Sequence, residues 1–363
     1  MKITHFIRNF EIGGLESVVL RLAELQVVNG YEVRIVCIEK EQQAVLDYSA
    51  TNINIVKLNK KSRLLTLIRV FFELIRNRPD VINTHNFLAN VYGAYVGHLL
   101  RIPICLTLHS GDCHCPKEFR RPSMFVPHHF ICVSSKIKDM LLSSTDGNIN
   151  EDLVSIINNG IDPGSFVNTE LSNAREEFEI SKNTFLVGTV GRLQPIKNQK
   201  ILLEAIAVLS KKNVNVHLLV IGDGPLRYDL ESLSISLGIQ NKVCFAGSRN
   251  DVARLLAGMD VFVLPSLAEG SPISLIEAMS VGLPVVATAV GAIPNIIQNK
   301  INGYLVPSAD LPALVKRLKY IIENTKLSND VGKRAYETIQ KEHSMDKMLL
   351  SYYEIYKNIS GCH

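Results

Sequence analysis

The alternation of strand-like apolar runs with helix-like amphipathic segments, repeated along the whole chain, is the feature that most restricts its fold. In the first half, helices are predicted at 15–29 and 62–77, between strands at 3–8, 32–38, 53–57, 81–84, 104–108 and 129–133. Strands that alternate with helices in this way are typical of a doubly wound parallel sheet. The sequence therefore predicts an α/β fold.

The same alternation begins again after a polar stretch rich in turn formers, which starts near Asn158 and continues to Asn183. Strands are then predicted at 185–190, 216–221, 243–246, 261–264, 284–288 and 302–306. At 363 residues, the chain is also longer than a typical domain with a single hydrophobic core. We predict two domains, 1–162 and 163–344, with a last helix, 345–359, that packs back on the first.

Composition excludes several functional classes. Hydrophobic residues make up 47% and charged residues 20%, as in an ordinary globular protein. A net charge of +4 is too small to indicate nucleic-acid binding. Seven cysteines without framework spacing indicate reduced thiols. The charged N-terminal strand lacks the apolar core of a signal peptide, and no long apolar run predicts a membrane span. We expect a cytosolic protein.

Two glutamates flank the start of a predicted helix at 272–281. Glu269 follows the strand that ends at Pro265, and Glu277 lies inside the helix. Ser271 is the expected N-cap. Free amides near residues 273–275 would favour an anionic ligand, and the carboxylates would accept hydrogen bonds from ligand hydroxyls. This arrangement suits a polyhydroxylated phosphate ester.

Basic residues and glycines follow other predicted strands. Arg192 and Lys197 come after Gly191, where they could neutralise a diphosphate; the alternative is a solvated basic loop. Gly13 and Gly14 enter the first helix, where they could leave amides free for phosphate or simply form a tight turn.

The remaining candidates are weaker on their own. His109 ends a strand and could donate to a hydroxyl or be structural. Turns at 222–225 and 247–251 could offer groups to a base. Cys113-His114-Cys115 lacks a second cysteine pair at zinc spacing, so a zinc site is disfavoured. The chain contains no Asp-x-Asp motif for a divalent cation, and we predict neither a metal nor another cofactor.

The segment 57–78 is basic and contains an amphipathic helix. It holds seven lysines and arginines against one glutamate. Such a helix can lie on an anionic membrane surface. The alternative is a helix that covers the sheet and exposes a solvated basic face.

Taken together and in order, these motifs resemble the GT4 family of retaining glycosyltransferases, which have the GT-B fold. The resemblance covers nearly the whole chain and is strongest over 188–307. It rests on Gly191-Arg192-Leu193 with Lys197, Gly222-Asp223-Gly224-Pro225, Glu269 with Glu277, Gly13-Gly14-Leu15-Glu16, 133–136 and 159–162.

The resemblance implies two Rossmann-like domains facing a central cleft, with a nucleotide-sugar, a UDP-sugar more readily than a GDP-sugar, bound to the second. Glu269, His109, Arg192 and Lys197 would form the catalytic set. The implied donor-binding residues are Gly13, Gly14, Gly191, Gly222, Arg249, Gly270, Ser271, Ile273, Ser274, Leu275 and Glu277. The reaction would retain anomeric configuration and would need no metal. The acceptor would be a glycan or a lipid-linked molecule of surface polysaccharide or glycolipid biosynthesis, at the inner face of the membrane.

Two other functions remain open on the same fold. A sugar-nucleotide epimerase would convert the donor with no acceptor present. A non-catalytic sugar-nucleotide binding protein would bind the donor without transfer or hydrolysis.

Overall fold

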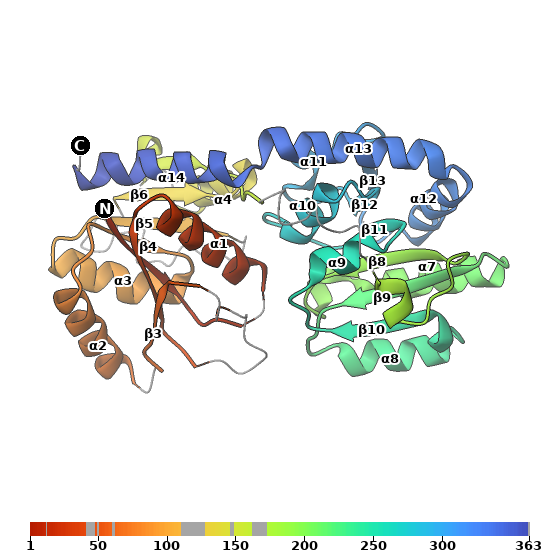
Figure 1. Cartoon of the computed structure of the whole chain (residues 1–363), viewed down its shortest axis with the longest axis horizontal. Coiled ribbons are helices and arrows are strands. Elements are labelled where there is room, and N and C mark those ends of the chain that lie inside the picture. The colour runs from red at the N-terminus through yellow and green to blue at the C-terminus, as the bar shows by residue number, and fades with distance from the viewer. Residues whose placement is uncertain are drawn as a thin grey trace. The chain divides into compact units, whose positions relative to one another are not determined.

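The computed structural model describes residues 1–11, 13–40, 48, 51–59, 62–109, 128–145, 149–161 and 173–361. The chain divides into two compact units. Unit 1 consists of 1–160 and 345–363, and unit 2 of 161–344. Each unit is built on its own parallel sheet (Figure 1), so the prediction of an α/β protein with two doubly wound units is confirmed.

In the described part of unit 1, the sheet has seven strands in the order β3-β2-β1-β4-β5-β6-β7. All pairs are parallel. The strands are β1 (Lys2–Ile7), β2 (Glu32–Cys37), β3 (Asn54–Lys57), β4 (Val81–Thr84), β5 (Ile104–Leu108), β6 (His129–Cys132) and β7 (Val154–Ile156). The helices are α1 (Gly14–Val28), α2 (Arg63–Arg76), α3 (Phe87–Leu99), α4 (Ser135–Ser144) and α14 (Met345–Ser360).

The described part of unit 2 has six strands in the order β10-β9-β8-β11-β12-β13. These are β8 (Phe185–Val190), β9 (Val216–Ile221), β10 (Val243–Gly247), β11 (Val261–Leu264), β12 (Val285–Thr288) and β13 (Tyr304–Val306). The helices are α6 (Ala174–Glu177), α7 (Gln199–Lys211), α8 (Arg227–Ser236), α9 (Val252–Ala257), α10 (Ile273–Ser280), α11 (Ile293–Ile296), α12 (Leu311–Glu323) and α13 (Thr325–Glu342).

Both sheets reverse their strand order beside the first strand of the unit. The reversal falls between β1 and β4 in unit 1, and between β8 and β11 in unit 2. In open α/β sheets, ligands bind outside the carboxyl ends of the strands at this point. The fold therefore directs attention to the loops that follow β1, β4, β8 and β11.

Helix α3 was not predicted, and its sequence explains why. It is apolar on most sides and contains Gly93 and Gly97, which disfavour a helix. A Cβ atom at Gly93 would lie 2.8 Å from the Thr84 side chain, and one at Gly97 2.9 Å from that of Ile82. The two glycines therefore let α3 pack closely against the sheet.

Helix α14 is the last helix of unit 1 and packs on its sheet. Tyr352 and Tyr356 are fully buried. Asn83, on β4, donates from Nδ2 to the Tyr356 hydroxyl at 2.6 Å. Thr107, on β5, makes a hydrogen bond of 3.3 Å to the Tyr352 hydroxyl. Burial raises the pKa of both phenols.

Candidate functional site

The loops after β8 and β11 are joined by one ion pair. Lys197 Nζ lies 2.6 Å from Glu269 Oε1, and the Glu269 side chain is only 7% exposed. Lys197 ends a short 3₁₀ turn after β8, whereas Glu269 precedes α10. The pair therefore lies at the strand-order reversal of unit 2, where a ligand is expected.

The Glu269 carboxylate is held on one side. Its Oε1 atom also accepts a hydrogen bond of 2.6 Å from Ser266 Oγ. Within the described residues, Glu269 Oε2 has no hydrogen-bond partner. One oxygen is thus fixed by the protein, and the other can accept from a hydroxyl.

Ser266 was not predicted as a site residue. It directly follows the strand-ending Pro265, which was the available signal.

Arg192 lies in the same loop as Lys197 but has a different environment. Its side chain is exposed. It forms no ion pair with another described residue. Its backbone is fixed, because Gln199 donates to the Arg192 carbonyl at 3.1 Å. A free guanidinium at the end of a buried strand can bind a phosphate oxygen.

Two glycines allow the backbone of this region to pack closely. Gly222 has φ +127°, and a Cβ there would lie 2.2 Å from the Gly191 carbonyl oxygen. Gly291 has φ +56°, and a Cβ there would lie 1.8 Å from the carbonyl oxygen of Glu269. Any side chain at 222 or 291 would displace the loops that carry Lys197 and Glu269.

The predicted start of α10 was wrong by one position. Pro272, not Ser271, is the N-cap, and no side chain caps the helix. Leu275 donates its amide to the Pro272 carbonyl, so only Ile273 and Ser274 remain as candidate free amides of the predicted set. The predicted end, at 281, is one residue late: α10 ends at Ser280, two residues before Gly282, which has φ +72°.

Arg249 is held by carboxylates. It donates twice to Asp251, at 2.8 Å each, and once to Glu177 at 2.6 Å. Arg254 contacts the same two carboxylates. Hydrogen bonds from Arg254 and Arg249 lower the pKa of Glu177, and that of Asp251 is lowered chiefly by Arg249. The Arg249 guanidinium is thus engaged within the protein.

The unit 1 candidates lie at two places. Gly13 is the extended N-cap of α1 and Gly14 is its first residue. His109 directly follows β5. Its ring Nε2 lies 3.0 Å from His85 Nδ1, and its own Nδ1 is buried without a partner in the described residues. Burial lowers the pKa of His109 to about 4. Residues 113–115 lie outside the described residues, among which no metal-binding cluster of three or more His, Cys, Asp or Glu occurs.

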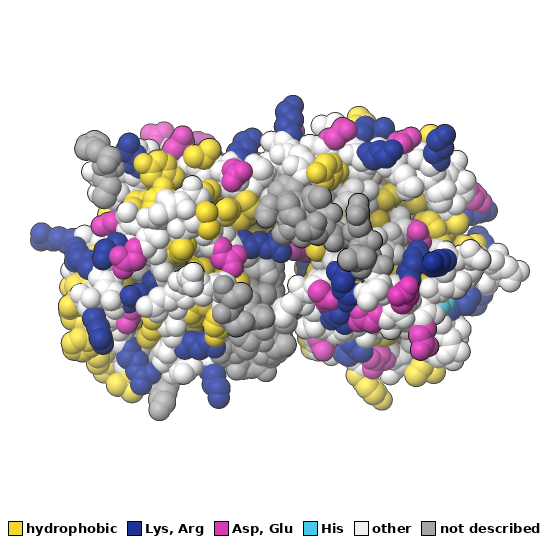
Figure 2. All heavy atoms as spheres, viewed as in Figure 1, with side chains coloured by type: hydrophobic (Ala, Val, Ile, Leu, Met, Phe, Trp, Pro, Cys, Tyr) yellow, Lys and Arg dark blue, Asp and Glu magenta, His cyan; other side chains and the backbone are white. Residues whose placement is uncertain are grey.

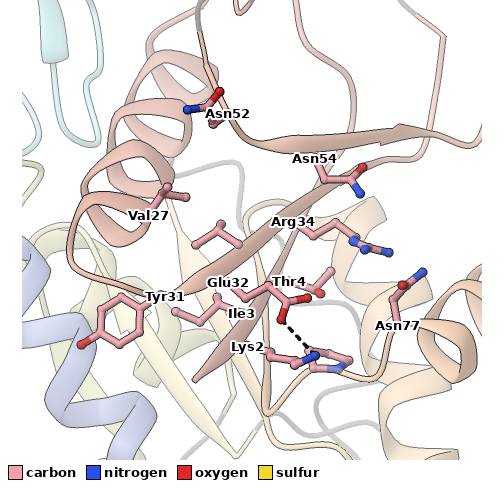
Figure 3. A pocket seen from close by; sticks show the side chains of 12 residues that line it. Lys2, Ile3, Thr4, Val27, Tyr31, Glu32, Arg34, Asn52, Asn54 and Asn77 are labelled. Carbon is pink, nitrogen blue, oxygen red and sulfur yellow. Dashed lines mark ion pairs between the residues drawn. The ribbon is translucent and has the colours of Figure 1, made fainter.

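A cavity of about 260 Å³ in unit 1 lies at the opposite edge of its sheet. Figure 3 shows that it is lined by residues from the start of β1 and β2, where Lys2 and Glu32 form an ion pair of 2.9 Å. Because ligands bind at the carboxyl ends of parallel strands, this cavity is not the candidate site.

The fold, with two parallel sheets of Rossmann-like strand order, is that of the GT-B class of glycosyltransferases. Residues 172–338 match the family described as Glycosyl transferases group 1, and residues 12–165 match Glycosyltransferase Family 4. The chain belongs to the GT4-type glycosyltransferases.

Known proteins with whole-chain similarity agree. An uncharacterized glycosyltransferase of Methanocaldococcus jannaschii is 26% identical, over 95% of this chain and 94% of its own length. The Escherichia coli UDP-Gal:alpha-D-GlcNAc-diphosphoundecaprenol alpha-1,3-galactosyltransferase is 24% identical, over 98% of this chain and 96% of its own length. The structure of Anabaena HepE with UDP-glucose superposes with a TM-score of 0.86 at 21% identity, over 99% of this chain and all of HepE.

Proposed function

We propose that the chain is a metal-independent retaining glycosyltransferase that uses a nucleotide-sugar, a UDP-sugar in preference to a GDP-sugar, with unit 2 as the donor-binding unit. The observation that carries this proposal is the Lys197–Glu269 pair beside the exposed Arg192. The E. coli relative is named for a UDP-galactose donor, and HepE was crystallised with UDP-glucose. Both names favour a uridine donor.

The residues of the site suit the two ends of such a donor. Arg192 and Lys197 would neutralise the diphosphate, which becomes the leaving group. Glu269 Oε2 would accept from a hydroxyl of the sugar, and Glu277 from the ribose. The start of α10, with Gly270, Ser271 and the amides of Ile273 and Ser274, would support the phosphates. Gly191 and Gly222 would allow close approach of the ligand.

The two remaining assignments lie in unit 1. His109 would contact the donor sugar, and the Gly13–Gly14 amides at the start of α1 would contact phosphate. Retention follows from the family resemblance. It requires that the acceptor oxygen attack from the face that the leaving group vacates.

The test is incubation with a panel of UDP- and GDP-sugars and candidate glycan and lipid-linked acceptors. Nucleotide release and the anomeric configuration of the product are measured. We expect an α-linked product from an α-linked donor, with no loss of rate in a chelator. An inverted product contradicts retention. Donor conversion without acceptor would instead indicate an epimerase, and tight donor binding without transfer or hydrolysis a binding protein.

We also propose that unit 1 contacts an anionic membrane surface through α2 and α3, consistent with a lipid-linked acceptor. Helix α2 buries Thr66, Val70 and Leu74 against its own unit. A second apolar face is exposed, with Leu64 68% and Phe72 64% accessible. Helix α3 adds an exposed stripe of its own, consisting of Val91, Tyr95 and Leu99.

Cations flank this apolar face. Arg63 and Arg76 are exposed on α2. Figure 2 shows hydrophobic side chains beside lysine and arginine side chains over α2, at the lower left. An apolar helix face edged by cations binds anionic lipid surfaces through burial of its apolar side chains and through attraction between the cations and the lipid headgroups. No helix within the described residues is long and apolar enough to span a bilayer.

Vesicle sedimentation tests this contact. Binding is expected to vesicles of phosphatidylcholine with an anionic phospholipid, and to be weak with phosphatidylcholine alone. The Phe72→Ser variant should bind roughly tenfold more weakly, because its apolar area leaves the bilayer. The matched control is Ile235→Ser, which changes a 65% exposed residue of unit 2. Equal loss in both variants would contradict the assignment of the surface.

A further inference from the structure

Three histidines from separate strands form a continuous hydrogen-bonded chain inside unit 1. His5 lies on β1, and His85 and His109 directly follow β4 and β5. His5 Nδ1 lies 2.8 Å from His85 Nε2, and His85 Nδ1 lies 3.0 Å from His109 Nε2. At the other end, His5 Nε2 lies 2.7 Å from Gln26 Oε1, on α1. This series of hydrogen bonds, which we call the histidine relay, therefore runs from Gln26 on α1 to the candidate site residue His109.

Each of these rings is neutral near neutral pH. His5 and His85 are fully buried. Burial lowers the pKa of His5 to about 4 and that of His85 well below its ordinary value. A neutral imidazole has one nitrogen that donates and one that accepts. Because the rings are linked in series, the tautomer of one ring determines the tautomer of the next.

Gln26 determines which nitrogen of each ring donates and which accepts. Its carbonyl oxygen accepts from His5 Nε2, so His5 Nδ1 must accept from His85 Nε2. His85 Nδ1 then accepts from His109 Nε2, which leaves His109 Nδ1 unprotonated. If the Gln26 amide nitrogen faced His5 instead, every donor and acceptor in the chain would be reversed, and His109 Nδ1 would carry the hydrogen.

The surroundings of Gln26 favour the carbonyl orientation. Gln26 is 1% exposed, and its side chain lies beside the Tyr356 hydroxyl. That hydroxyl already accepts from Asn83 Nδ2, whose Oδ1 in turn accepts from Thr107. Gln26 Nε2 is buried and has no hydrogen-bond partner of standard geometry within the described residues. Gln26 lowers the pKa of Tyr356, as an N–H group directed at the phenol oxygen does and a carbonyl would not, so the amide nitrogen faces Tyr356 and the carbonyl faces His5.

We propose that Gln26, His5 and His85 are positioning residues that fix the tautomer of His109, so that His109 presents an unprotonated Nδ1 to the ligand. This atom is buried and has no partner in the described residues. An unprotonated ring nitrogen accepts from a hydroxyl and repels a phosphate oxygen. His109 is thereby specific for a hydroxyl group of the sugar ligand; that the ligand is a sugar rests on the proposed function, whereas the tautomer does not.

The tautomer is measured on the ligand-free protein by long-range proton–nitrogen NMR with 15N-labelled histidine. Protonated and unprotonated ring nitrogens have well-separated shifts. The chain has ten histidines, so the His109 signals are assigned by their loss in His109→Asn. We expect Nε2 to be protonated and Nδ1 unprotonated. A protonated Nδ1, or an equal mixture, overturns the proposal.

The relay is tested with Gln26→Leu, which keeps the volume and removes the hydrogen bond. His109 should then show both tautomers, and kcat/KM should fall about tenfold, as for one lost hydrogen bond. The matched control is Thr66→Val, which removes a buried hydroxyl elsewhere in unit 1 and should leave the His109 signals unchanged. A single, unchanged tautomer in Gln26→Leu contradicts the relay.

The outcomes separate this proposal from the proposed function. A protein with the expected tautomer but without sugar transfer keeps the relay and loses the function. A protein that transfers sugar with a protonated His109 Nδ1 keeps the function and loses the relay. If Gln26→Leu does not fold, the wild-type spectrum still decides the tautomer.

Discussion

Lys197 Nζ and Glu269 Oε1 are 2.6 Å apart, although 72 residues separate them in sequence. The contact closes the loops after β8 and β11 over the strand-order reversal of unit 2. Since Glu269 is nearly buried, its charge depends on Lys197 and Ser266 for compensation. The two side chains are therefore expected to behave as one unit.

A double-mutant cycle tests this coupling. Glu269→Ala and Lys197→Ala should each lower kcat/KM roughly 100-fold, because each removes a charged group that we propose contacts the donor. The double variant should be little worse than either single variant, since residues that act as a unit are not additive. Initial rates of nucleotide release provide the measurement.

The control for this cycle is Lys200→Ala. Lys200 lies on α7 near Lys197, and its side chain is 66% exposed. Its replacement should change the rate less than about twofold. Fully additive losses at 197 and 269 would show that the pair is not coupled.

A second prediction concerns the glycine behind Glu269. Gly291→Ala should destabilise the protein by about 2–4 kcal/mol, because a methyl group there would meet the Glu269 carbonyl oxygen and the backbone is left-handed. Gly238→Ala is the matched control, with φ +70° and no described atom within 4 Å of the added Cβ. It should cost only about 1 kcal/mol. Urea unfolding measures both, and equal losses would show that the close approach is unimportant.

Arg249 leads to a third prediction. Because its guanidinium is engaged by Asp251 and Glu177, Arg249→Ala and Asp251→Ala should both lower stability by about 1–2 kcal/mol. Donor affinity should stay within about twofold, as measured by calorimetry. Lys319→Ala, which breaks an exposed pair with Glu323, should have little effect on either. A tenfold loss of donor affinity without loss of stability would instead assign Arg249 to the donor.

The sequence predicted the strands well, because buried parallel strands are short apolar runs bounded by turn residues. Strands 81–84, 104–108, 185–190, 216–221 and 261–264 agree to the residue. Helix α3 was missed, since its helical conformation comes from packing against the sheet and not from local preference. Helix α4 and strand β7 were also not predicted.

The candidate site was predictable in unit 2 and only partly in unit 1. Arg192, Lys197 and Glu269 each follow a strong strand signal, so the sheet rule brings their loops to one edge. The partners of His109 were not predicted, because His5 and His85 lie 80 residues apart and look like ordinary strand residues. Their contact follows only from the placement of β4 between β1 and β5.

The buried histidines also predict how stability depends on pH. In the folded protein the pKa of His5 and that of His109 are lowered from 6.5 to about 4, first by burial. Between these values the unfolded chain binds more protons, so stability falls as the pH drops from about 6.5 towards 4. The pKa of Glu177 in the folded protein is lowered from 4.5, so the stability that such carboxylates contribute is lost mainly at lower pH.

Urea unfolding should therefore show that the free energy of unfolding falls by about 2 kcal/mol for each of these histidines when the pH is lowered from about 6.5 to about 5. His5→Gln removes one titrating group, so the slope of stability against pH should decrease even if the variant is less stable at every pH. Thr66→Val, which changes a buried residue of α2 that does not titrate, should leave the slope unchanged. An unchanged slope in His5→Gln would mean that His5 is not held neutral in the folded protein.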